Sequence, residues 1–418
     1  MISGKLIRIF GSSFVIQSII QLLGILTGIY LVRTLAIDEY GYYTISNTIF
    51  STMLILADGG LNSSLIRRGG QVYKNKEELR ITLSTGLEIR KKFAKIVLII
   101  TIPILIFLLK YHGASNLFTF LITLSVVFSF LSTLTSSIYE IPFKLSKNII
   151  FIQKNQLLVN LTRTLISFIM VTIFPFSFIG IAAIGFSRAI GNYFLKIKNK
   201  DLKLKDKKNE IVEKDLIKDI KKIMPTSIFY CISGQLTIYI ITIFGDINSL
   251  ASYGALTRVT AILAVFSSIF TVIMIPEFAK TQRKENVIKL FIKNQLAMFV
   301  ISLILIFFVY VFDSEILFVL GSNYMSLNKE LILVFIMGCL GFVGSISSAL
   351  MNVKSIIMHP LYFITCSLFI QILFIFICDL KTLSGVIIYG IFTTLAIYLV
   401  RIFYFLFFIF YLKENHVK

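Results

Sequence analysis

Charged residues are scarce in this sequence. They make up 15% of its 418 residues, and 57% of the residues are hydrophobic; soluble chains carry about 25% charged residues. The apolar residues fall in blocks of about twenty, the length that a helix needs to cross a hydrocarbon core of roughly 30 Å. The composition excludes an ordinary soluble protein and predicts an all-α, multi-pass integral membrane protein.

Residues suited to several kinds of chemistry are missing as well. The four cysteines lie inside or at the edge of apolar blocks, which argues against a disulfide framework or a cysteine metal site. The three histidines show no ligand spacing, and no GxxxxGK[ST] nucleotide-binding loop is present. We therefore expect no enzyme activity, no metal and no cofactor, while coupling to a proton or sodium gradient stays open.

Basic residues outnumber acidic ones, 41 to 21. In a soluble domain this excess would suggest nucleic acid, but here the basic residues lie between the apolar spans. If the spans alternate in direction, 32 of the 41 lysines and arginines fall on one side, which identifies that side as the cytoplasm. We expect both termini there and no nucleic-acid partner. The predicted spans are residues 11–32, 42–61, 93–110, 117–138, 151–174, 178–195, 224–244, 255–275, 291–312, 331–352, 361–379 and 385–412.

A basic connection at residues 196–223 divides the spans into two groups of six, at residues 1–195 and 224–418. Apolar residues recur in it at helical spacing between lysines, namely Val212, Leu216, Ile220 and Ile223. This pattern favours a helix lying on the cytoplasmic membrane surface and attracted to anionic lipid. A solvated, charge-rich linker is the alternative.

Residues 34–68 contain an acidic turn followed by Tyr40-Gly41-Tyr42-Tyr43, then an apolar segment that ends at Asp58-Gly59-Gly60-Leu61 and Arg67-Arg68. Aromatic side chains at one end and arginines at the other fit one membrane crossing. The stretch resembles the first two helices of Wzx-type polysaccharide flippases, members of the multidrug/oligosaccharidyl-lipid/polysaccharide (MOP) exporter superfamily. Residues 316–324 (ILFVLGSNY) before a glycine-rich span, and a span closing on Pro276, resemble later helices of these proteins.

The resemblance implies two six-helix bundles of the MATE-like fold. It implies a transporter that moves undecaprenyl-pyrophosphate-linked oligosaccharide repeat units across the bacterial cytoplasmic (inner) membrane by alternating access, for O-antigen of lipopolysaccharide or for capsule. Partners would be the lipid-linked oligosaccharide, membrane lipids, and a polysaccharide polymerase with its chain-length regulator. Tyr40-Gly41 and Tyr253-Gly254 stand at the same entry of the second helix of each half, as expected of duplicated bundles.

Four arginines fall within predicted spans: Arg163, Arg188, Arg258 and Arg401. Arginine in hydrocarbon costs about 2.5–3.5 kcal/mol on insertion scales, so each should face protein or a water-filled cavity. A guanidinium also matches the oxygens of phosphate and stays charged when desolvated. We expect a cationic central cavity, with Arg163 and Arg258 as first choices. Arg188 and Arg401 fit a second interpretation, in which they extend toward the cytoplasmic interface.

The deepest acid is Asp58, which suits either ion coupling or a structural ion pair with Arg67, Arg68 or Arg8. Amide side chains within spans are candidates for sugar contacts or, as we favour, for helix–helix hydrogen bonds. These amides are Gln17, Gln21, Asn47, Asn160 and Gln235.

Two other functions stay open. A MATE-type, cation-coupled drug exporter predicts acids at the midplane, where this sequence has arginines. An integral-membrane polysaccharide polymerase or ligase predicts a long outer loop bearing Arg or His, which the sequence lacks.

Overall fold

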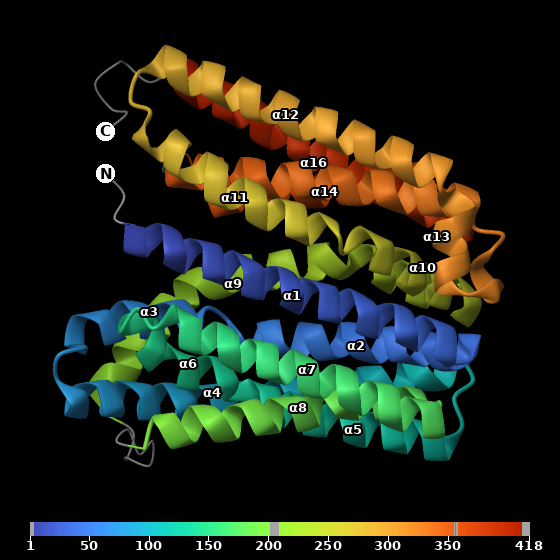
Figure 1. Ribbon diagram of the computed structural model, residues 1–418, viewed down its shortest axis with the longest axis horizontal. Coiled ribbons are helices and arrows are strands. Elements are labelled where there is room, and N and C mark those ends of the chain that lie inside the picture. The colour runs from blue at the N-terminus through green and yellow to red at the C-terminus, as the bar shows by residue number, and fades with distance from the viewer. Residues whose placement is uncertain (1–3, 201–208, 355, 357, 412–418) are drawn as a thin grey trace. The chain divides into compact units, whose positions relative to one another are not determined.

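The computed structural model describes residues 4–200, 209–354, 356 and 358–411. These residues form sixteen α-helices and one 3-10 helix, with no strand among them (Figure 1). The elements are α1 (Gly4–Thr34), α2 (Ile37–Asp58), α3 (Leu61–Val72), α4 (Lys76–Tyr111), α5 (Asn116–Leu134), α6 (Ser136–Leu145), α7 (Ile149–Ile173), α8 (Ser177–Lys198), α9 (Glu210–Phe244), α10 (Ile247–Thr260), α11 (Leu263–Lys280), α12 (Lys284–Val311), α13 (Asp313–Leu320), η1 (Ser322–Tyr324), α14 (Asn328–Val353), α15 (Pro360–Ile377) and α16 (Leu383–Tyr411).

Twelve helical segments of the described chain are long and apolar enough to cross a membrane, which confirms the predicted number. Three of them consist of two helices each: α2 with α3, α5 with α6, and α10 with α11. Several segments extend well beyond the predicted spans, because hydropathy marks only the apolar part of a helix. The predicted span at 255–275 belongs to a segment that runs from Ile247 to Lys280.

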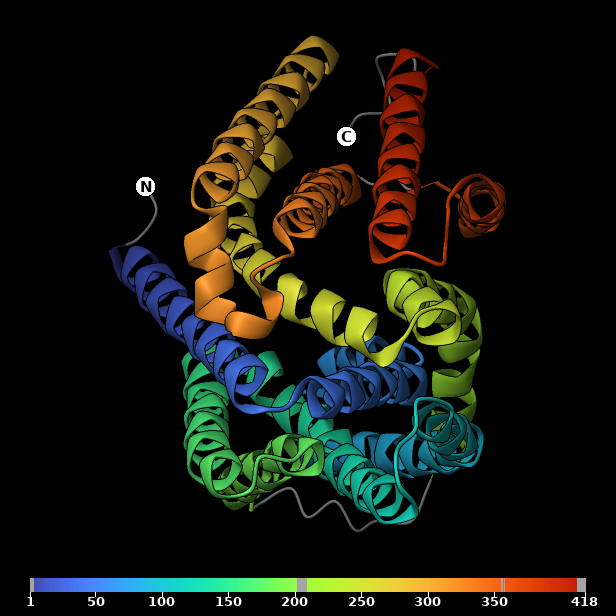
Figure 2. The same cartoon turned by 90° about the vertical axis from the view of Figure 1, so that its right-hand side faces the viewer.

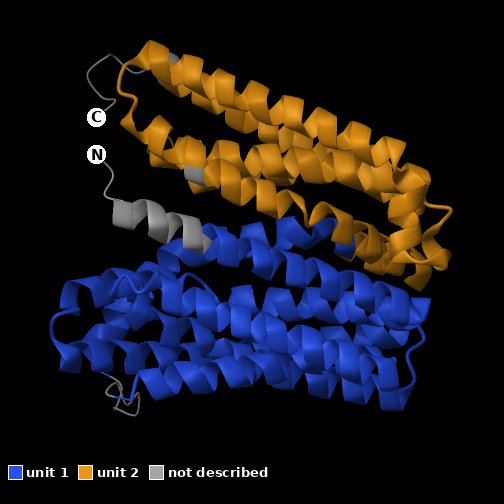
Figure 3. Cartoon of the chain, in the orientation of Figure 1, with its two compact units in different colours: residues 1–238 blue, residues 239–418 orange. Residues whose placement is uncertain are grey.

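The chain folds into two compact units, residues 1–238 and 239–418 (Figure 3). The boundary falls inside α9, so unit 1 includes most of the seventh predicted span. This division differs from the predicted lobes at 1–195 and 224–418, because the first turns of α9 pack on the helices that precede them.

The transmembrane helices of unit 1 approach each other closely where small residues allow it. α1 lies along α7, and α5 lies along α8 (Figure 2). A Cβ atom added at Gly185 of α8 would meet the Phe128 ring at 2.6 Å, and Ser129 Oγ donates to the Ile181 carbonyl at 2.7 Å. Glycine at the contact and a hydrogen bond across it are the usual means of holding membrane helices together.

One end of unit 1 carries a compact apolar cluster that extends the bundle. We call it the basic end; it is built from α3, the first turns of α4, α6 and the first turns of α9. Leu61, Leu65, Leu83, Ile141 and Leu216 are all fully buried in it. The cluster corrects the prediction for the amphipathic segment, because the apolar side chains of Val212, Leu216 and Ile220 pack on protein and not on lipid.

Unit 2 is arranged around α14, which packs against α10, α11, α12 and α16. A Cβ atom at Gly338 would lie 3.0 Å from Thr260, so glycine permits the close contact with α10. Gln295 of α12 exchanges hydrogen bonds with Ser347 of α14, and Tyr398 of α16 donates to the same amide at 2.8 Å. This network supplies the polar contacts that join three helices of unit 2.

Candidate functional site

Two arginines lie opposite each other in the hairpin of α7 and α8. Arg163 is ten residues before the end of α7 and Arg188 eleven residues after the start of α8. At 1.5 Å per residue, both lie about 15 Å from the turn that joins the helices. Arg188 lies near the middle of α8, which continues to Lys198, and its extension toward the cytoplasmic interface stays a prediction.

Arg163 is half-buried and only partly satisfied by protein. One terminal nitrogen donates to the Tyr43 hydroxyl at 3.3 Å, and its Nε is buried with no hydrogen-bond partner among the described residues. Tyr43 is itself buried in α2, and a Cβ atom at Gly180 would touch its ring at 3.2 Å. A fixed tyrosine thus orients Arg163 but leaves a guanidinium N–H without an acceptor.

Arg188 is less satisfied still. Within the described part of the chain its guanidinium makes no hydrogen bond and no ion pair, although the charges of Glu140 and Arg163 act on it. The nearby carboxylate of Glu140 is already engaged by Lys144 at 3.1 Å. Two desolvated cations therefore stand close together without a carboxylate bonded to either, an arrangement suited to an anionic ligand.

The predicted amides make few hydrogen bonds among the described residues. Asn160, one turn from Arg163, donates back to the Gln156 carbonyl of its own helix at 2.8 Å. The side-chain amides of the other four are half-buried and make no hydrogen bond to any described residue: Gln17, Gln21, Asn47 and Gln235. Within the described part of the chain these amides make no hydrogen bond to another helix, and their role in helix–helix contacts stays a prediction.

Hydroxyl groups make those contacts in unit 1. Thr27 of α1 bonds Thr164 of α7 at 2.8 Å, and Tyr30 of α1 donates to the Phe168 carbonyl at 3.0 Å while its ring stacks on Phe168. The amides are thereby left open to other partners.

The two other predicted arginines belong to unit 2. Arg258 lies eleven residues into α10, about 16 Å along it, in the last turn before the break at Ala261. We predicted it one turn inside a span that begins at residue 255, and α10 begins eight residues earlier. Arg401 of α16 donates to Ser348 Oγ, and its guanidinium lies 4.8 Å from the centre of the Phe363 ring.

Asp58 pairs with a residue that the sequence did not single out. Its carboxylate accepts from Arg90 of α4, whose side chain is 5% exposed. Arg67 and Arg68 instead bind Asp215 and Asp219 at the start of α9, so the predicted pairing with them is wrong. Pairing with Arg8 lies outside the described side chains.

Arg90 precedes the predicted span at 93–110 and was interpreted as part of a polar connection. The sequence nevertheless contains a pattern that indicates its burial. Leu79, Leu83, Leu87 and Ala94 recur at helical spacing and are buried, and Arg90 occupies the same stripe of α4. A charge on an otherwise apolar helix face predicts a buried ion pair.

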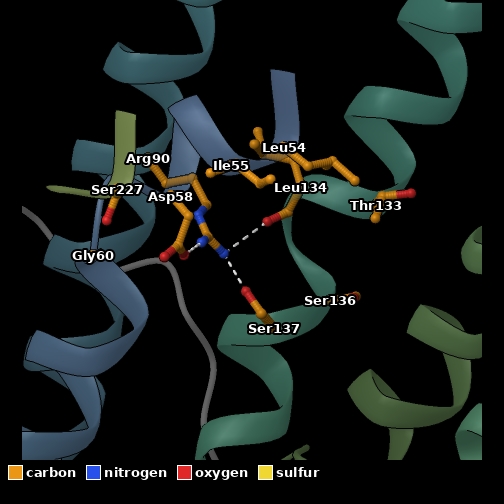
Figure 4. Close-up of a pocket in the computed structure, with 10 residues that line it drawn as sticks. All are labelled: Leu54, Ile55, Asp58, Gly60, Arg90, Thr133, Leu134, Ser136, Ser137 and Ser227. Atoms are coloured by element: carbon orange, nitrogen blue, oxygen red, sulfur yellow. Dashed lines mark hydrogen bonds and ion pairs between the residues drawn. The ribbon is translucent and has the colours of Figure 1, made fainter. Parts of the chain in front are cut away.

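The Asp58–Arg90 pair lines a cavity of about 340 Å³. Its other lining groups include four hydroxyls, from Thr133, Ser136, Ser137 and Ser227 (Figure 4). All of these residues belong to unit 1. Unit 1 thus holds a cationic pair near the middle of α7 and α8 and a neutralised pair at its basic end.

Comparison with known proteins adds the family. The family described as polysaccharide biosynthesis protein matches residues 30–329, which is most of the chain. The chain belongs to this family. The match includes Arg163, Arg188, Arg258 and the Asp58–Arg90 pair of this polysaccharide biosynthesis protein, and Arg401 lies beyond it. No curated protein matches the chain in sequence.

Solved structures show that this polysaccharide biosynthesis protein has the MATE-like fold, as predicted. An inward-facing multidrug resistance MATE family transporter of the MOP superfamily matches with a TM-score of 0.70 at 16% identity, over 94% of this chain and 97% of that one. A MATE protein in its bent conformation matches with a TM-score of 0.63 at 15% identity, over 99% and 96%.

A third solved structure with this fold is described by the polarity of its binding pocket. It is a MOP superfamily transporter from Pyrococcus furiosus, for which a reverse polarity of the binding pocket suggests a different function. It matches with a TM-score of 0.59 at 14% identity, over 96% of this chain and 95% of that one.

Proposed function

We propose that this protein is a flippase for undecaprenyl-pyrophosphate-linked oligosaccharide repeat units, working by alternating access in the bacterial cytoplasmic membrane with both termini in the cytoplasm. The product would feed O-antigen or capsule assembly, together with a polymerase and a chain-length regulator. The observation that carries the proposal is the pair Arg163 and Arg188, which lie at similar distances from the turn between α7 and α8 without a bonded carboxylate. The family supports a glycan substrate and the fold supports transport.

The chemistry of the pair fits a pyrophosphate. A guanidinium offers N–H donors in a planar fork that matches two phosphate oxygens, and it remains protonated when buried. The free donors are the buried Nε of Arg163 and the unbonded guanidinium of Arg188. An entering pyrophosphate would satisfy these donors and relieve the repulsion between the two cations.

Polar groups of unit 1 suit the sugar part of the substrate. Asn160 lies one turn from Arg163, and the amides of Gln17, Gln21 and Asn47 are half-buried with no hydrogen bond to the described residues. Amides donate and accept at once, so they can bind sugar hydroxyls of varied orientation.

The other two functions have less support. A MATE-type exporter of cationic drugs shares the fold, but a site with two positive charges that no carboxylate neutralises repels such a substrate. A polymerase or ligase would need a large outer region to hold its reaction. The connection between α12 and α14, residues 312–327, holds only the short helices α13 and η1.

Complementation tests the proposal. The wild type, Arg163→Ala and Arg188→Ala would be expressed in a surface-glycan strain that lacks its own flippase, and lipid-linked repeat units would be counted in each leaflet. Lys95→Ala is the matched control, because Lys95 is a cation in a span but is exposed on α4. We expect outward delivery by the wild type and the control, and at least a tenfold loss in both arginine variants. Full transport by both variants at normal expression would overturn the cationic site.

A further inference from the structure

One arginine at the basic end of unit 1 binds the ends of two broken spans. Arg90, on the uninterrupted helix α4, donates to the carboxylate of Asp58, the last residue of α2. It also donates to the carbonyl oxygen of Leu134, the last residue of α5, at 3.1 Å, and to the hydroxyl of Ser137 in the first turn of α6 (Figure 4). Its three acceptors therefore come from two different spans.

The charge of Arg90 suits this position. The C-terminus of a helix carries about half a negative charge from its unsatisfied carbonyls, so a cation there is stabilising. Arg90 lies at two such ends at once and at the Asp58 carboxylate. The geometry explains why a side chain that is 5% exposed can stay charged.

Both spans are interrupted at this point. Gly59 and Gly60 have φ of +49° and +89°, which separates α2 from α3, and Thr135 separates α5 from α6. The cavity of about 340 Å³ lies beside the two breaks. It provides space and hydroxyl groups where the two helical spans are interrupted.

We propose that Arg90 is a positioning residue that holds the breaks of α2–α3 and α5–α6 together as one joint, and that Asp58 serves this joint instead of binding a coupling ion. The guanidinium has five donors, and its buried Nε has no partner in the described chain. Arg90 can thus exchange acceptors with the hydroxyls of Thr133, Ser136 and Ser227 as the joint bends.

The ion pair argues against coupling at Asp58. A proton or sodium ion that binds its carboxylate has to compete with a guanidinium held there by the protein itself. If the Asp58 carboxylate left Arg90 to bind such an ion, Arg90 would stay buried without its ion-pair partner, which is strongly unfavourable.

The first test separates positioning from substrate binding, and it rests on the proposed function. Outward transport and the binding of farnesyl pyrophosphate, a soluble stand-in for the headgroup, would be measured for Arg90→Lys and Asp58→Asn. Lys91→Ala is the control, since Lys91 follows Arg90 and is exposed. We expect transport at least tenfold slower with binding within twofold of wild type, and no change in the control. Wild-type transport in Arg90→Lys, or binding lost in proportion to transport, would overturn the proposal.

The second test does not depend on the substrate. Single cysteines S136C and S227C would be placed in a variant lacking the four native cysteines, and their rates of reaction with a thiol reagent compared. Adding Asp58→Asn should raise both rates at least fivefold, and Lys91→Ala should leave them unchanged. Unchanged rates in Asp58→Asn would overturn the joint. The labelling rates could rise on adding Asp58→Asn while the wild type moves no lipid-linked glycan. That outcome would refute the proposed substrate and support the joint.

The role of Asp58 is tested by ion dependence. The residual transport of Asp58→Asn should keep the wild-type dependence on the proton or sodium gradient. Loss of that dependence would show that Asp58 is the coupling site and would overturn this part of the proposal.

Discussion

Two sets of arginines in unit 1 differ in what the protein offers them. Arg90 has a carboxylate, a helix-terminal carbonyl and a hydroxyl, so most of its donors are used inside the fold. Arg163 has one tyrosine hydroxyl, and Arg188 has no hydrogen bond to the described residues. The difference separates a charge that holds helices together from charges that are available to a ligand, although all three lie in apolar surroundings.

Removing both available charges should give the largest effect on transport. We expect Arg163→Gln with Arg188→Gln to lower transport at least about 100-fold, because hydrogen bonds to charged groups contribute about 1.5–3 kcal/mol each. The thermal melting temperature should stay the same or rise, since two neighbouring like charges are removed. A leaflet assay and a melting curve on the same preparation check both parts. A marked fall in melting temperature would contradict the distinction between the two sets.

Arg90→Gln should act in the opposite way, on stability. Breaking a buried ion pair costs about 3–5 kcal/mol. Because Asp58 is 30% exposed, we expect about 3 kcal/mol, the lower end of that range. The measurement is the thermal melt in detergent, with Lys91→Gln as the control. If Arg90→Gln melts at the same temperature as Lys91→Gln, Arg90 contributes no more to stability than Arg163.

The joint beside Arg90 can be disturbed without touching a charge. Gly60→Ala places a side chain at φ of +89°, with its Cβ 2.5 Å from Ile223, and we expect a loss of about 2 kcal/mol. Gly113→Ala isolates the backbone part, because Gly113 has φ of +86° and no atom within 4 Å of the added Cβ. Adding Ile223→Ala to Gly60→Ala should recover only part of the difference between the two variants, because the Cβ of residue 223 still lies 2.8 Å from the added Cβ. Equal losses at both glycines would mean that contact with α9 is unimportant.

A smaller change tests how Arg163 is oriented. Tyr43→Phe removes the hydroxyl that accepts from Arg163 but keeps the ring that packs at Gly180. One hydrogen bond contributes about 1 kcal/mol, so transport should fall about fivefold. Binding of farnesyl pyrophosphate gives an independent reading. An unaffected Tyr43→Phe would mean that Arg163 is positioned by its packing alone.

The smallest effect is expected at the surface ion pairs of the basic end. Arg67 binds Asp215 and Asp219, but its side chain is 45% exposed, so solvent screens both interactions. Arg67→Ala should lower the free energy of unfolding by less than about 1 kcal/mol, measured by the same melt. A loss as large as that of Arg90→Gln would show that burial does not decide the contribution of these arginines.

Much of the fold was predictable from composition and order along the chain. Twelve apolar segments and the MATE-like fold follow from the length of the hydrophobic blocks and from the motifs around Tyr40 and Asp58. The helix bounds were less predictable: α8 runs to Lys198, beyond the predicted end of its span at residue 195, and α10 starts at Ile247, before the predicted start at residue 255. Hydropathy marks only the apolar part of a helix, so the depths of Arg188 and Arg258 in the membrane stay predictions.

The sequence by itself determined that the chain spans a membrane and that arginines lie within its spans, because both follow from the local free energy of transfer of each segment. Only the tertiary structure decided which arginine has a partner. Arg90 and Asp58 are 32 residues apart, and Arg163 and Tyr43 are 120 apart. Pairing over such separations depends on how helices pack, and packing depends on side-chain shape across the whole unit. The same dependence placed the apolar face of α9 on protein where local pattern favoured lipid.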